Sequence, residues 1–430
     1  MTGANGTRGL DVVRAELERA ATTLGTPLYV MDEPTLEAAA ARLEAAFPDP
    51  WIRQYSLKAN DLPEVVAILA ARGWGANVVS SGEWRQAAEA GVPHHAVTFE
   101  GIGKSDAELG WAVQGAAVGE PVRWLALESA AEARALGALA DRSGLGRDDR
   151  SCLDVLLRLN PQVAPETLPG LAVGSGSSKF GMDEAEIMSL VRDGLDRPGL
   201  RVRGIHVHVG SDLGDVSAWA DAGLRAVRLL REISAYVERA DTVDFGGGFP
   251  LELDGGPAPA AFHDALLRRL SAEGLELPPR RAVEPGRYLV GAAGWLVGRV
   301  LHSRPRPPYA QQVVLDAGMT ELIRPALYGS HHPVHALDLG HEDDELLETA
   351  VEGPVCESTD SFGLHALPAL GRGDLVAVAR AGAYAASFTS RYNGRPHPVE
   401  VVLRTDGSLQ RGARVDVERH APVPAGVAPR

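Results

Sequence analysis

The segment Ile52-Arg53-Gln54-Tyr55-Ser56-Leu57-Lys58-Ala59-Asn60 begins as a strand-like run and ends on a lysine beside an asparagine. A lysine alone in such a position is most often a solvated strand end. The same arrangement, a short run that ends in polar or glycine residues, recurs along the chain as far as Gly286. The repetition of this arrangement, more than the lysine itself, predicts the fold.

Eight such runs alternate with amphipathic stretches of helical period. This count and length predict an α/β fold, a (β/α)8 TIM barrel, and runs this apolar suit a parallel sheet covered on both faces. A doubly wound open sheet is the alternative. The runs are Ile52–Lys58, Gly75–Ser80, His95–Gly101, Arg123–Glu128, Asp154–Asn160, Arg203–Gly210, Thr242–Gly248 and Arg280–Gly286. The helical stretches include Leu62–Arg72, Ser105–Gln114, Ser129–Leu139, Glu184–Asp193, Val216–Arg239 and Pro259–Ala272.

Polar or glycine residues stand at seven of the eight strand ends. Barrel active sites are assembled at the carboxyl ends of the strands, so these residues are candidates for one site. They are Lys58, Ser80–Gly82, Glu100–Gly101, Arg158 with Asn160, His208–Gly210, Gly246–Gly248 and Glu284–Arg287.

After Gly291 the pattern changes to strands without regular helices, separated by glycine and proline turns. It predicts a C-terminal all-β domain of the sandwich or barrel-like kind, with Arg304–Pro308 as a loop. We expect the barrel at residues 35–288, the β domain at 10–34 and 289–418, and disordered tails at 1–9 and 421–430. The expected strands are Pro27–Met31, Gly294–Leu301, Gln311–Asp316, Thr349–Pro354, Asp374–Arg380 and Val399–Thr405.

Composition excludes several classes of protein. The 430 residues are 45% hydrophobic and carry 42 Lys plus Arg against 57 Asp plus Glu, a net charge of −15. This balance argues against nucleic acid or an anionic membrane as the main partner. With Cys152 and Cys356 as the only cysteines, no disulfide framework is expected. The first residues lack a signal peptide and no apolar run is long enough to span a bilayer, so a cytoplasmic protein is expected.

Three strand ends carry complementary chemistry. Lys58 in a partly dry barrel mouth offers a neutral amine that can attack an aldehyde. Gly246–Gly248 let backbone N–H groups converge on an anion, and Glu284 can keep a pyridine nitrogen protonated. His206 and His208 share one face of a strand, with His208 nearer the ligand. An amine, an anion cradle and a carboxylate for a pyridinium meet the needs of a pyridoxal-phosphate enzyme.

Each of these motifs also has an ordinary structural reading. The glycines can form a tight turn, and Glu284 can pair with its neighbour Arg287. Arginine forks bind carboxylates bidentately, which makes Arg287 and Arg324 candidate substrate binders together with Tyr328. No metal site is expected, although the cluster His331–His335 contains three histidines.

As a set, the motifs resemble the alanine-racemase-fold (type III) pyridoxal-phosphate decarboxylases, and within them the diaminopimelate decarboxylases most closely. The resemblance runs from about Pro27 to Val401. Its motifs are Tyr55–Asn60, Lys179–Gly181, His208–Ser211, Gly246–Gly248, Glu284–Arg287, Asp316–Met319, Leu322–Tyr328, Gly353–Asp360 and Gly382–Tyr384.

The resemblance implies that Lys58 carries pyridoxal 5'-phosphate, that His208 stacks on its ring and that Glu284 holds the pyridinium. It implies a homodimer with shared active sites, in which Cys356 of the partner subunit returns a proton to Cα after carbon dioxide leaves. The implied phosphate contacts are Ser211, Gly246, Gly247, Gly248, Gly286 and Tyr384. The implied substrate contacts are Arg287, Arg324, Tyr328, Glu357 and Ser358.

The implied reaction is decarboxylation of meso-2,6-diaminopimelate to L-lysine, a step of lysine biosynthesis, because Glu357 stands where ornithine-type relatives usually carry aspartate. Asp212, where relatives commonly have glutamine, and the flanking Phe245 and Phe249 leave an alternative open. The alternative is a relative that acts on another amino acid or conjugate, of the ornithine or lysine type or from secondary-metabolite or siderophore biosynthesis. A racemase and a cofactor-free regulatory homologue are further alternatives. The Cys356–Ser358 segment argues against the first and Lys58 against the second.

Overall fold

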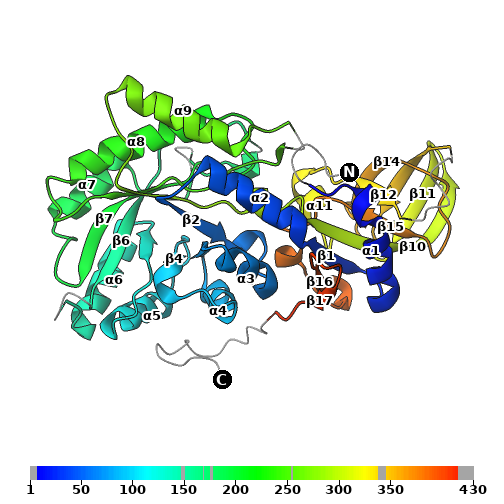
Figure 1. Ribbon diagram of the computed structural model, residues 1–430, viewed down its shortest axis with the longest axis horizontal. Helices are drawn as coiled ribbons and strands as arrows, with labels where there is room; N and C mark the ends of the chain where they lie inside the picture. Colours follow the sequence, from blue (N-terminus) through cyan, green and yellow to red (C-terminus); the bar gives the residue numbers. More distant parts are fainter. Residues whose placement is uncertain are drawn as a thin grey trace. The chain divides into compact units, whose positions relative to one another are not determined.

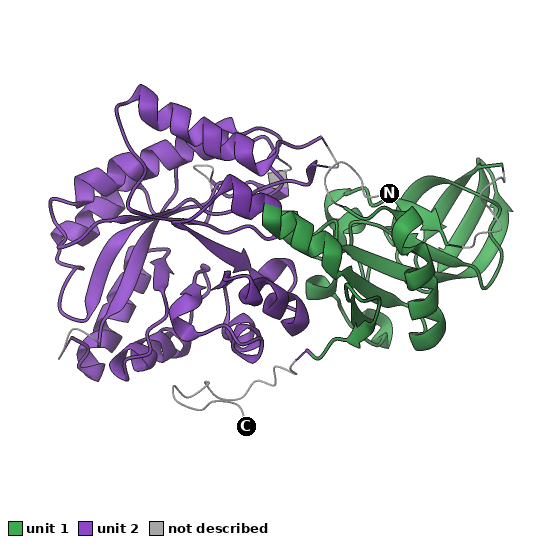
Figure 2. Cartoon of the chain, viewed as in Figure 1, with its two compact units in different colours: residues 1–41, 287–413 green, residues 42–286, 414–430 purple. Residues whose placement is uncertain are grey.

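The chain forms two compact units, Arg42–Gly286 with Arg414–Arg430 and Met1–Ala41 with Arg287–Ala413 (Figure 2). The computed structural model describes residues 7–146, 151–167, 169–174, 178–252, 255–337 and 345–414. Of the tails expected to be disordered, residues 1–6 and 421–430 lie outside the described residues. Arg8 is hydrogen-bonded, donating to Asp32 Oδ1 (2.9 Å) and to Thr35 Oγ1 (3.0 Å).

In the first of these units, eight parallel strands close into a barrel (Figure 1). Closure is made by β2 and β9, with Trp51 opposite Arg281 and Arg53 opposite Val283. The predicted barrel is therefore confirmed, and the doubly wound alternative is wrong because an open sheet has two unpaired edges. The strands are β2 (Trp51–Ser56), β3 (Gly75–Val78), β4 (Val97–Phe99), β5 (Trp124–Leu127), β6 (Leu153–Leu159), β7 (Leu200–Val207), β8 (Thr242–Asp244) and β9 (Arg280–Val283).

Four helices of the barrel begin with the same local device. Ser80, Ser105, Ser129 and Asp183 each accept a hydrogen bond from the backbone N–H of a glutamate three residues later, which satisfies a donor at the helix start. These caps fix how the chain turns from a strand end into the next helix. The helices are α2 (Glu33–Ala46), α3 (Pro63–Ala71), α4 (Ser81–Glu89), α5 (Asp106–Ala117), α6 (Ala130–Ser143), α7 (Glu184–Arg192), α8 (Ser217–Ile233) and α9 (Pro259–Ala272).

An aromatic cluster packs α8 and α9 against the barrel. Trp219 on α8 lies 5.8 Å from both Phe245 and Phe262, measured between ring centroids, and Phe249 lies 5.1 Å from Phe262. Phe245 and Phe249 are almost fully buried. Rings at such separations add favourable edge contacts to the burial of apolar area. The two phenylalanines that flank the glycines are therefore core residues.

The other unit is built mainly of strands, as predicted, in the order β14-β13-β11-β10-β1-β16-β17 with β15 pairing β10 and β12. The segment 27–31 joins this sheet, since β1 pairs with both β10 and β16. The predicted loop at 304–308 is wrong in part because β10 continues to Arg306. The strands are β1 (Leu28–Asp32), β10 (Gly294–Arg306), β11 (Tyr309–Leu315), β12 (Val334–Ala336), β13 (Leu347–Glu352), β14 (Ser361–Leu367), β15 (Leu375–Val378), β16 (Val399–Leu403) and β17 (Leu409–Arg411).

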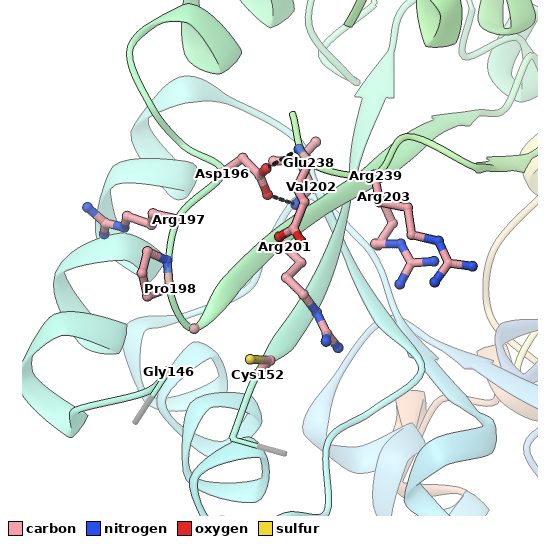
Figure 3. A pocket seen from close by; sticks show the side chains of 11 residues that line it. Gly146, Cys152, Asp196, Arg197, Pro198, Arg201, Val202, Arg203, Glu238 and Arg239 are labelled. Atoms are coloured by element: carbon pink, nitrogen blue, oxygen red, sulfur yellow. Dashed lines mark hydrogen bonds between the residues drawn. The ribbon is translucent and has the colours of Figure 1, made fainter. Parts of the chain in front are cut away.

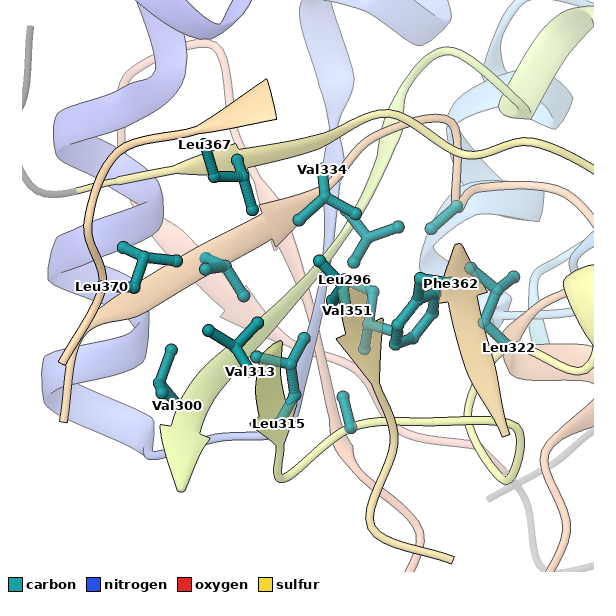
Figure 4. Packing of buried hydrophobic residues seen from close by; sticks show 14 of the residues in the cluster. Leu296, Val300, Val313, Leu315, Leu322, Val334, Val351, Phe362, Leu367 and Leu370 are labelled. Atoms are coloured by element: carbon teal, nitrogen blue, oxygen red, sulfur yellow. The ribbon is translucent and has the colours of Figure 1, made fainter. Parts of the chain in front are cut away.

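Two apolar clusters stabilise this sheet. One includes Leu296, Val313 and Phe362 from β10, β11 and β14 (Figure 4). The other packs helix α1 (Leu10–Leu24), which the sequence did not predict, against β1 through Leu17 and Leu28. Two short helices, α10 (Arg287–Val290) and α11 (Arg324–Tyr328), complete the unit. Among the described residues, no helix is long and apolar enough to cross a membrane.

Gly75→Ala should lower the free energy of unfolding by about 1–3 kcal/mol, the usual cost of overpacking against fixed neighbours. A Cβ at this position would collide with the Ala96 carbonyl oxygen and the Gln54 side chain. The matched control is Gly110→Ala in α5, where a Cβ meets nothing within 4 Å and should stabilise by up to about 1 kcal/mol. Chemical denaturation measures both variants, and equal stabilities would contradict the described packing.

Candidate active site

A layer of polar side chains lies inside the barrel towards the carboxyl ends of its strands. Arg158 on β6, His206 on β7 and Asp244 on β8 stand in register with one another, and all three are buried. Residues in register on adjacent strands share a face, so these side chains form one row. Asn77 on β3 and Glu284 just after β9 are buried at the same end. The barrel therefore gathers polar groups where the sequence predicted a site.

Lys58 lies in a single 3-10 turn, η1 (Leu57–Ala59), directly after β2, and is half-buried. The end of β9 holds this turn in place. Ser56 Oγ donates to the carbonyl oxygen of Glu284 (2.9 Å), and a Cβ on Gly286 would stand only 3.2 Å from the Ser56 Cβ. A side chain at 286 would therefore press on the residues on either side of Lys58 in the sequence, Ser56 and Ala59.

The glycine turn after β8 has no room for side chains. Gly246 and Gly248 have φ values of +69° and +109°, a region that L side chains rarely adopt. A Cβ on Gly247 would collide with the Glu284 carbonyl oxygen, and one on Gly248 would lie 2.7 Å from Leu213 Cδ1. The turn is thus pressed against the ends of β9 and the β7–α8 loop.

His208 follows β7 and faces this turn. Its Nδ1 accepts a hydrogen bond from the Gly247 N–H (3.2 Å), while the Gly246 N–H donates to Asp244 Oδ1 (3.0 Å). Desolvation, and secondly the charge of Lys58, lowers the pKa of His208 well below its ordinary value, so the ring is neutral at pH 7. The sequence expected the glycine N–H groups to converge on an anion, whereas these two have acceptors within the protein.

Glu284 belongs to a buried cluster of acids around one imidazole. Its Oε1 accepts a hydrogen bond from Asn77 Nδ2, and its Oε2 lies 3.5 Å from His206 Nε2. The same nitrogen is 3.4 Å from Glu100 Oε2. Burial lowers the pKa of His206 to about 4, and burial followed by the charge of Glu284 raises the pKa of Glu100 to about 8. The same two causes raise the pKa of Asp244 well above its ordinary value.

A buried ion pair flanks this cluster. Arg158 Nη1 donates to Glu128 Oε1, and the Gly181 N–H donates to Glu128 Oε2 (3.0 Å). The Arg158 guanidinium also lies 4.8 Å from the centroid of the Phe180 ring. Burial alone would raise the pKa of Glu128, but the Arg158 charge holds it below its ordinary value. Within the Lys179–Gly181 motif, Phe180 and Gly181 therefore contact the ion pair of Arg158 and Glu128.

The β7–α8 loop is hydrogen-bonded to the connection between β6 and α7. The Ser211 N–H donates to the Leu171 carbonyl (3.2 Å), and Thr167 Oγ1 donates to the Ser211 carbonyl (2.6 Å). Asp212, the next residue, has a left-handed φ of +62°. These bonds fix the backbone of Ser211, the residue that follows Gly210.

In the β-rich unit, four of the predicted site residues lie together. Arg287 and Arg324 are both buried, and their guanidinium carbons lie 5.1 Å and 5.9 Å from the Tyr384 ring centroid. Arg324 is also 5.6 Å from the ring of Tyr328. Tyr384 has a left-handed φ of +56°, an uncommon backbone conformation for a bulky residue. Contacts between guanidinium groups and aromatic faces fix this set.

Cys356–Ser358 is exposed on a loop that is braced from within. The carboxylate of Asp360 accepts the Val355 N–H (2.6 Å), and the Asp360 N–H donates to the Glu357 carbonyl (3.1 Å). Tyr392 donates its hydroxyl to Glu357 Oε1 (2.6 Å), and Asn393 Nδ2 lies 3.5 Å from Cys356 Sγ. The loop thus presents a thiol and a carboxylate on an ordered surface.

The predicted site residues fall into two groups, one in each unit. The barrel unit contains Lys58, His208, Ser211, Gly246, Gly247, Gly248, Glu284 and Gly286. The β-rich unit contains Arg287, Arg324, Tyr328, Cys356, Glu357, Ser358 and Tyr384.

Three polar residues near Lys58 and Glu284 received no role from the sequence. Asn77 and Glu100 contact the Glu284 cluster, and Glu83 accepts the Val79 N–H (2.8 Å). Burial raises the pKa of Glu83 to about 7, against the opposing charge of Lys58. The alternation of side chains along a strand could have identified Asn77, which lies on a predicted strand. Whether its side chain faces the barrel interior, however, depends on the exact register of that strand.

A cavity of about 670 Å3 opens at the opposite end of the barrel, where β6 and β7 begin (Figure 3). Its arginines are paired: Arg201 and Arg203 with Asp154 (2.8 and 3.3 Å), and Arg203 and Arg239 with Asp241 (2.5 and 2.8 Å). Active sites of such barrels lie at the carboxyl face. We therefore place the candidate site at the Lys58 end.

The residues at that end suit pyridoxal phosphate. The glycine turn carries no side chains and lies beside His208 and the end of β9, so its backbone can come close to a ligand. Glu100 Oε1, Asp244 Oδ2 and both ring nitrogens of His206 are buried and have no hydrogen-bond partner among the described residues. Buried polar atoms of this kind are rare and often mark functional sites. A cofactor with a ring nitrogen and a phosphate fits this donor and acceptor set.

Comparison with known proteins agrees with the site. Residues 34–291 match the family described as "Pyridoxal-dependent decarboxylase, pyridoxal binding domain". The diaminopimelate decarboxylase of Aquifex aeolicus is 32% identical over 92% of this chain and 90% of its own length, and that of Zymomonas mobilis is 32% identical over 96% of each.

Solved structures give the same result. Diaminopimelate decarboxylase from Helicobacter pylori complexed with L-lysine is 29% identical, with a TM-score of 0.82 over 92% of this chain and 96% of that one. A lysine/ornithine decarboxylase from Vibrio vulnificus, at 22% identity and a TM-score of 0.76, shares the fold. From its barrel, its polar strand ends and these matches, the chain belongs to the pyridoxal-dependent decarboxylase family.

Proposed function

We propose that this chain decarboxylates meso-2,6-diaminopimelate to give L-lysine and carbon dioxide. The observation that carries the proposal is the match to diaminopimelate decarboxylases over nearly the whole length of both chains. It is supported by the similar Helicobacter pylori structure that contains L-lysine. Phe245 and Phe249, which suggested another substrate, are core residues and give that alternative no support.

We infer that Lys58 binds pyridoxal phosphate covalently, that His208 lies against its ring and that Glu284 faces the ring nitrogen. The bound cofactor supplies an electron sink for the pair left on Cα when carbon dioxide departs. A carboxylate favours the protonated nitrogen, and the neutral His208 ring adds no opposing charge. The phosphate would be held by Ser211, Gly246, Gly247, Gly248, Gly286 and Tyr384.

Substrate recognition is proposed for the β-rich unit. Arg287 and Arg324 are buried and held against Tyr384, so little side-chain entropy remains to be lost when they bind a carboxylate. Glu357 can accept from the distal ammonium group of the substrate. The proposed contacts are Arg287, Arg324, Tyr328, Glu357 and Ser358.

The exposed thiol suggests a shared active site. We infer a homodimer in which Cys356 of the partner subunit gives its proton to Cα after carbon dioxide leaves. The supporting observation is that Cys356–Ser358 is exposed and is hydrogen-bonded to Asp360 through Glu357 and to Asn393 through Cys356. A cytoplasmic location is part of the same proposal, consistent with a chain that contains two cysteines and no disulfide-rich pattern.

The purified chain with pyridoxal phosphate should release carbon dioxide and L-lysine from meso-2,6-diaminopimelate. Lysine, ornithine and carboxylated conjugates should react at least about tenfold more slowly because they leave the distal polar contacts unpaired. Product mass spectrometry of the panel measures this. Rapid turnover of a conjugate without lysine formation from diaminopimelate would favour the alternative substrate class.

Lys58→Ala should abolish the visible absorption band of the bound cofactor and the adduct trapped by borohydride, because Lys58 is the proposed point of attachment. The chain has three lysines, so peptide mapping can separate Lys58 from Lys104 and Lys179. Lys179→Ala, at an exposed position, is the matched control and should keep the band. A trapped adduct on another lysine would contradict the assignment.

Cys356→Ala should slow turnover by roughly a hundredfold or more while the cofactor band persists, because a general acid contributes about that factor. The control is Cys152→Ala, a buried cysteine before β6, which should turn over normally. Mixing the Lys58→Ala and Cys356→Ala chains should restore about a quarter of full activity if sites are shared across a symmetric dimer. A normal rate for Cys356→Ala, or sedimentation as a monomer, would count against the shared site.

A further inference from the structure

Three carboxyl groups meet around one imidazole in the barrel interior. Glu100, Glu284 and Asp244 are each at most 4% exposed, and ligand atoms of Glu100, His206 and Glu284 all lie within 4.8 Å of one another. Like charges this close in a dry interior repel strongly, so the carboxyls cannot all be ionised together. The cluster must therefore contain protons, or a cation must neutralise it.

The neighbouring charges do not neutralise the cluster. Arg158, which faces His206, is committed to Glu128 by a direct ion pair. Lys58 also acts on His206, but it stands at the strand end on the turn after β2. His206 is itself neutral at pH 7, because burial lowers its pKa to about 4. Protons on the carboxyls are thus the simplest compensation.

The hydrogen bonds indicate where a proton goes. Glu284 accepts a bond from Asn77 Nδ2, and Asp244 accepts one from the Gly246 N–H. Among the described residues, Glu100 Oε1 and Asp244 Oδ2 have no partner, and neither does the acceptor Asn77 Oδ1. The Gly246 N–H donates to the other oxygen of Asp244 and stabilises its charged form, so Glu100 is neutralised first. A proton on Glu100 would also supply the donor that this cluster lacks.

We propose that Glu100 is a positioning residue that stays neutral, donates a hydrogen bond within the cluster and leaves Glu284 as the ionised carboxylate that would face the cofactor's ring nitrogen. The last part rests on the proposed function, whereas the protonation of Glu100 concerns the protein alone. The raised pKa of Glu100, about 8, is consistent with this arrangement.

Infrared difference spectra of the full chain without cofactor test the protonation at pH 7. The wild-type minus Glu100→Gln difference spectrum should show the carbonyl band of a protonated carboxyl, which shifts in D2O. The difference spectrum for the matched control Glu120→Gln, at an exposed position, should show carboxylate bands. Carboxylate bands in the Glu100→Gln difference, or a stoichiometric divalent metal found by elemental analysis, would overturn the proposal.

The pH dependence gives a second measurement that a purely structural role would not produce. Because the pKa of Glu100 is raised from 4.5 to about 8, its stabilising contribution is full below pH 4.5 and is lost as pH rises through 8. The wild-type Tm should therefore fall relative to Glu100→Gln over this range. The protonated-carboxyl band of the wild type should itself weaken near pH 8. This measurement does not need the variant, so it can be made even if Glu100→Gln folds poorly. A Tm difference that does not change with pH would overturn the proposal.

A third measurement separates this proposal from the proposed function. With pyridoxal phosphate bound, the visible spectrum of wild type should change near pH 8 and that of Glu100→Gln should not. If Glu100→Gln lacks the infrared band but wild type forms no cofactor adduct at Lys58, the proposed function is refuted and the protonation of Glu100 still holds. If wild type forms the adduct at Lys58 but has no such band, the protonation of Glu100 is refuted and the proposed function still holds.

Discussion

Pairing of β2 with β9 closes the barrel, and the candidate site depends on this closure. It joins Ser56 to Glu284, 228 residues apart in the chain, through a hydrogen bond of 2.9 Å. The turn that carries Lys58 and the end of the strand that carries Glu284 are therefore built on one contact. The glycine turn after β8 packs against the same strand end through Gly247. An amine, a carboxylate and a glycine turn are thereby placed on the ends of the barrel strands, as precise chemistry requires.

The electrostatics of the barrel interior follow from its dryness. Arg158 and Glu128 satisfy each other, and both histidines of β7 and its end are held neutral by desolvation. Which carboxyl stays charged and faces a ligand then depends on a few hydrogen-bond donors, chiefly Asn77, which donates to Glu284. The protonation states of the buried carboxyls at pH 7 therefore depend on the hydrogen-bond donors around them as much as on the distances between charges.

Much of the fold was predictable because strand ends were marked in the sequence. Each barrel strand was placed within a few residues, and β1 was assigned to the second unit before its pairing was known. Helix α4 had no counterpart among the predicted helices, because Ser80-Ser81-Gly82 resembles a loop although it is the cap that starts the helix. Helix α1 was missed because nothing in its sequence shows the apolar sheet face that Leu17 covers.

The site was only partly predictable. Lys58, Glu284 and the glycines were visible as motifs, but the partners of the glycine N–H groups depend on side chains from other strands. Asn77 received no assignment and Glu100 was a strand-end candidate without a role, because a one-residue change in strand register would turn either away from the interior. Contacts between residues so distant in sequence are set by barrel closure, which no local pattern reports.

Gly286 and Arg287 are consecutive residues that belong to different units. The first presses on the turn that bears the lysine, and the second stacks on Tyr384 within the other unit. No residue separates these two sets of contacts, so a residue inserted between Gly286 and Arg287 would displace one of them. Changes of chain length are better tolerated in exposed strand connections.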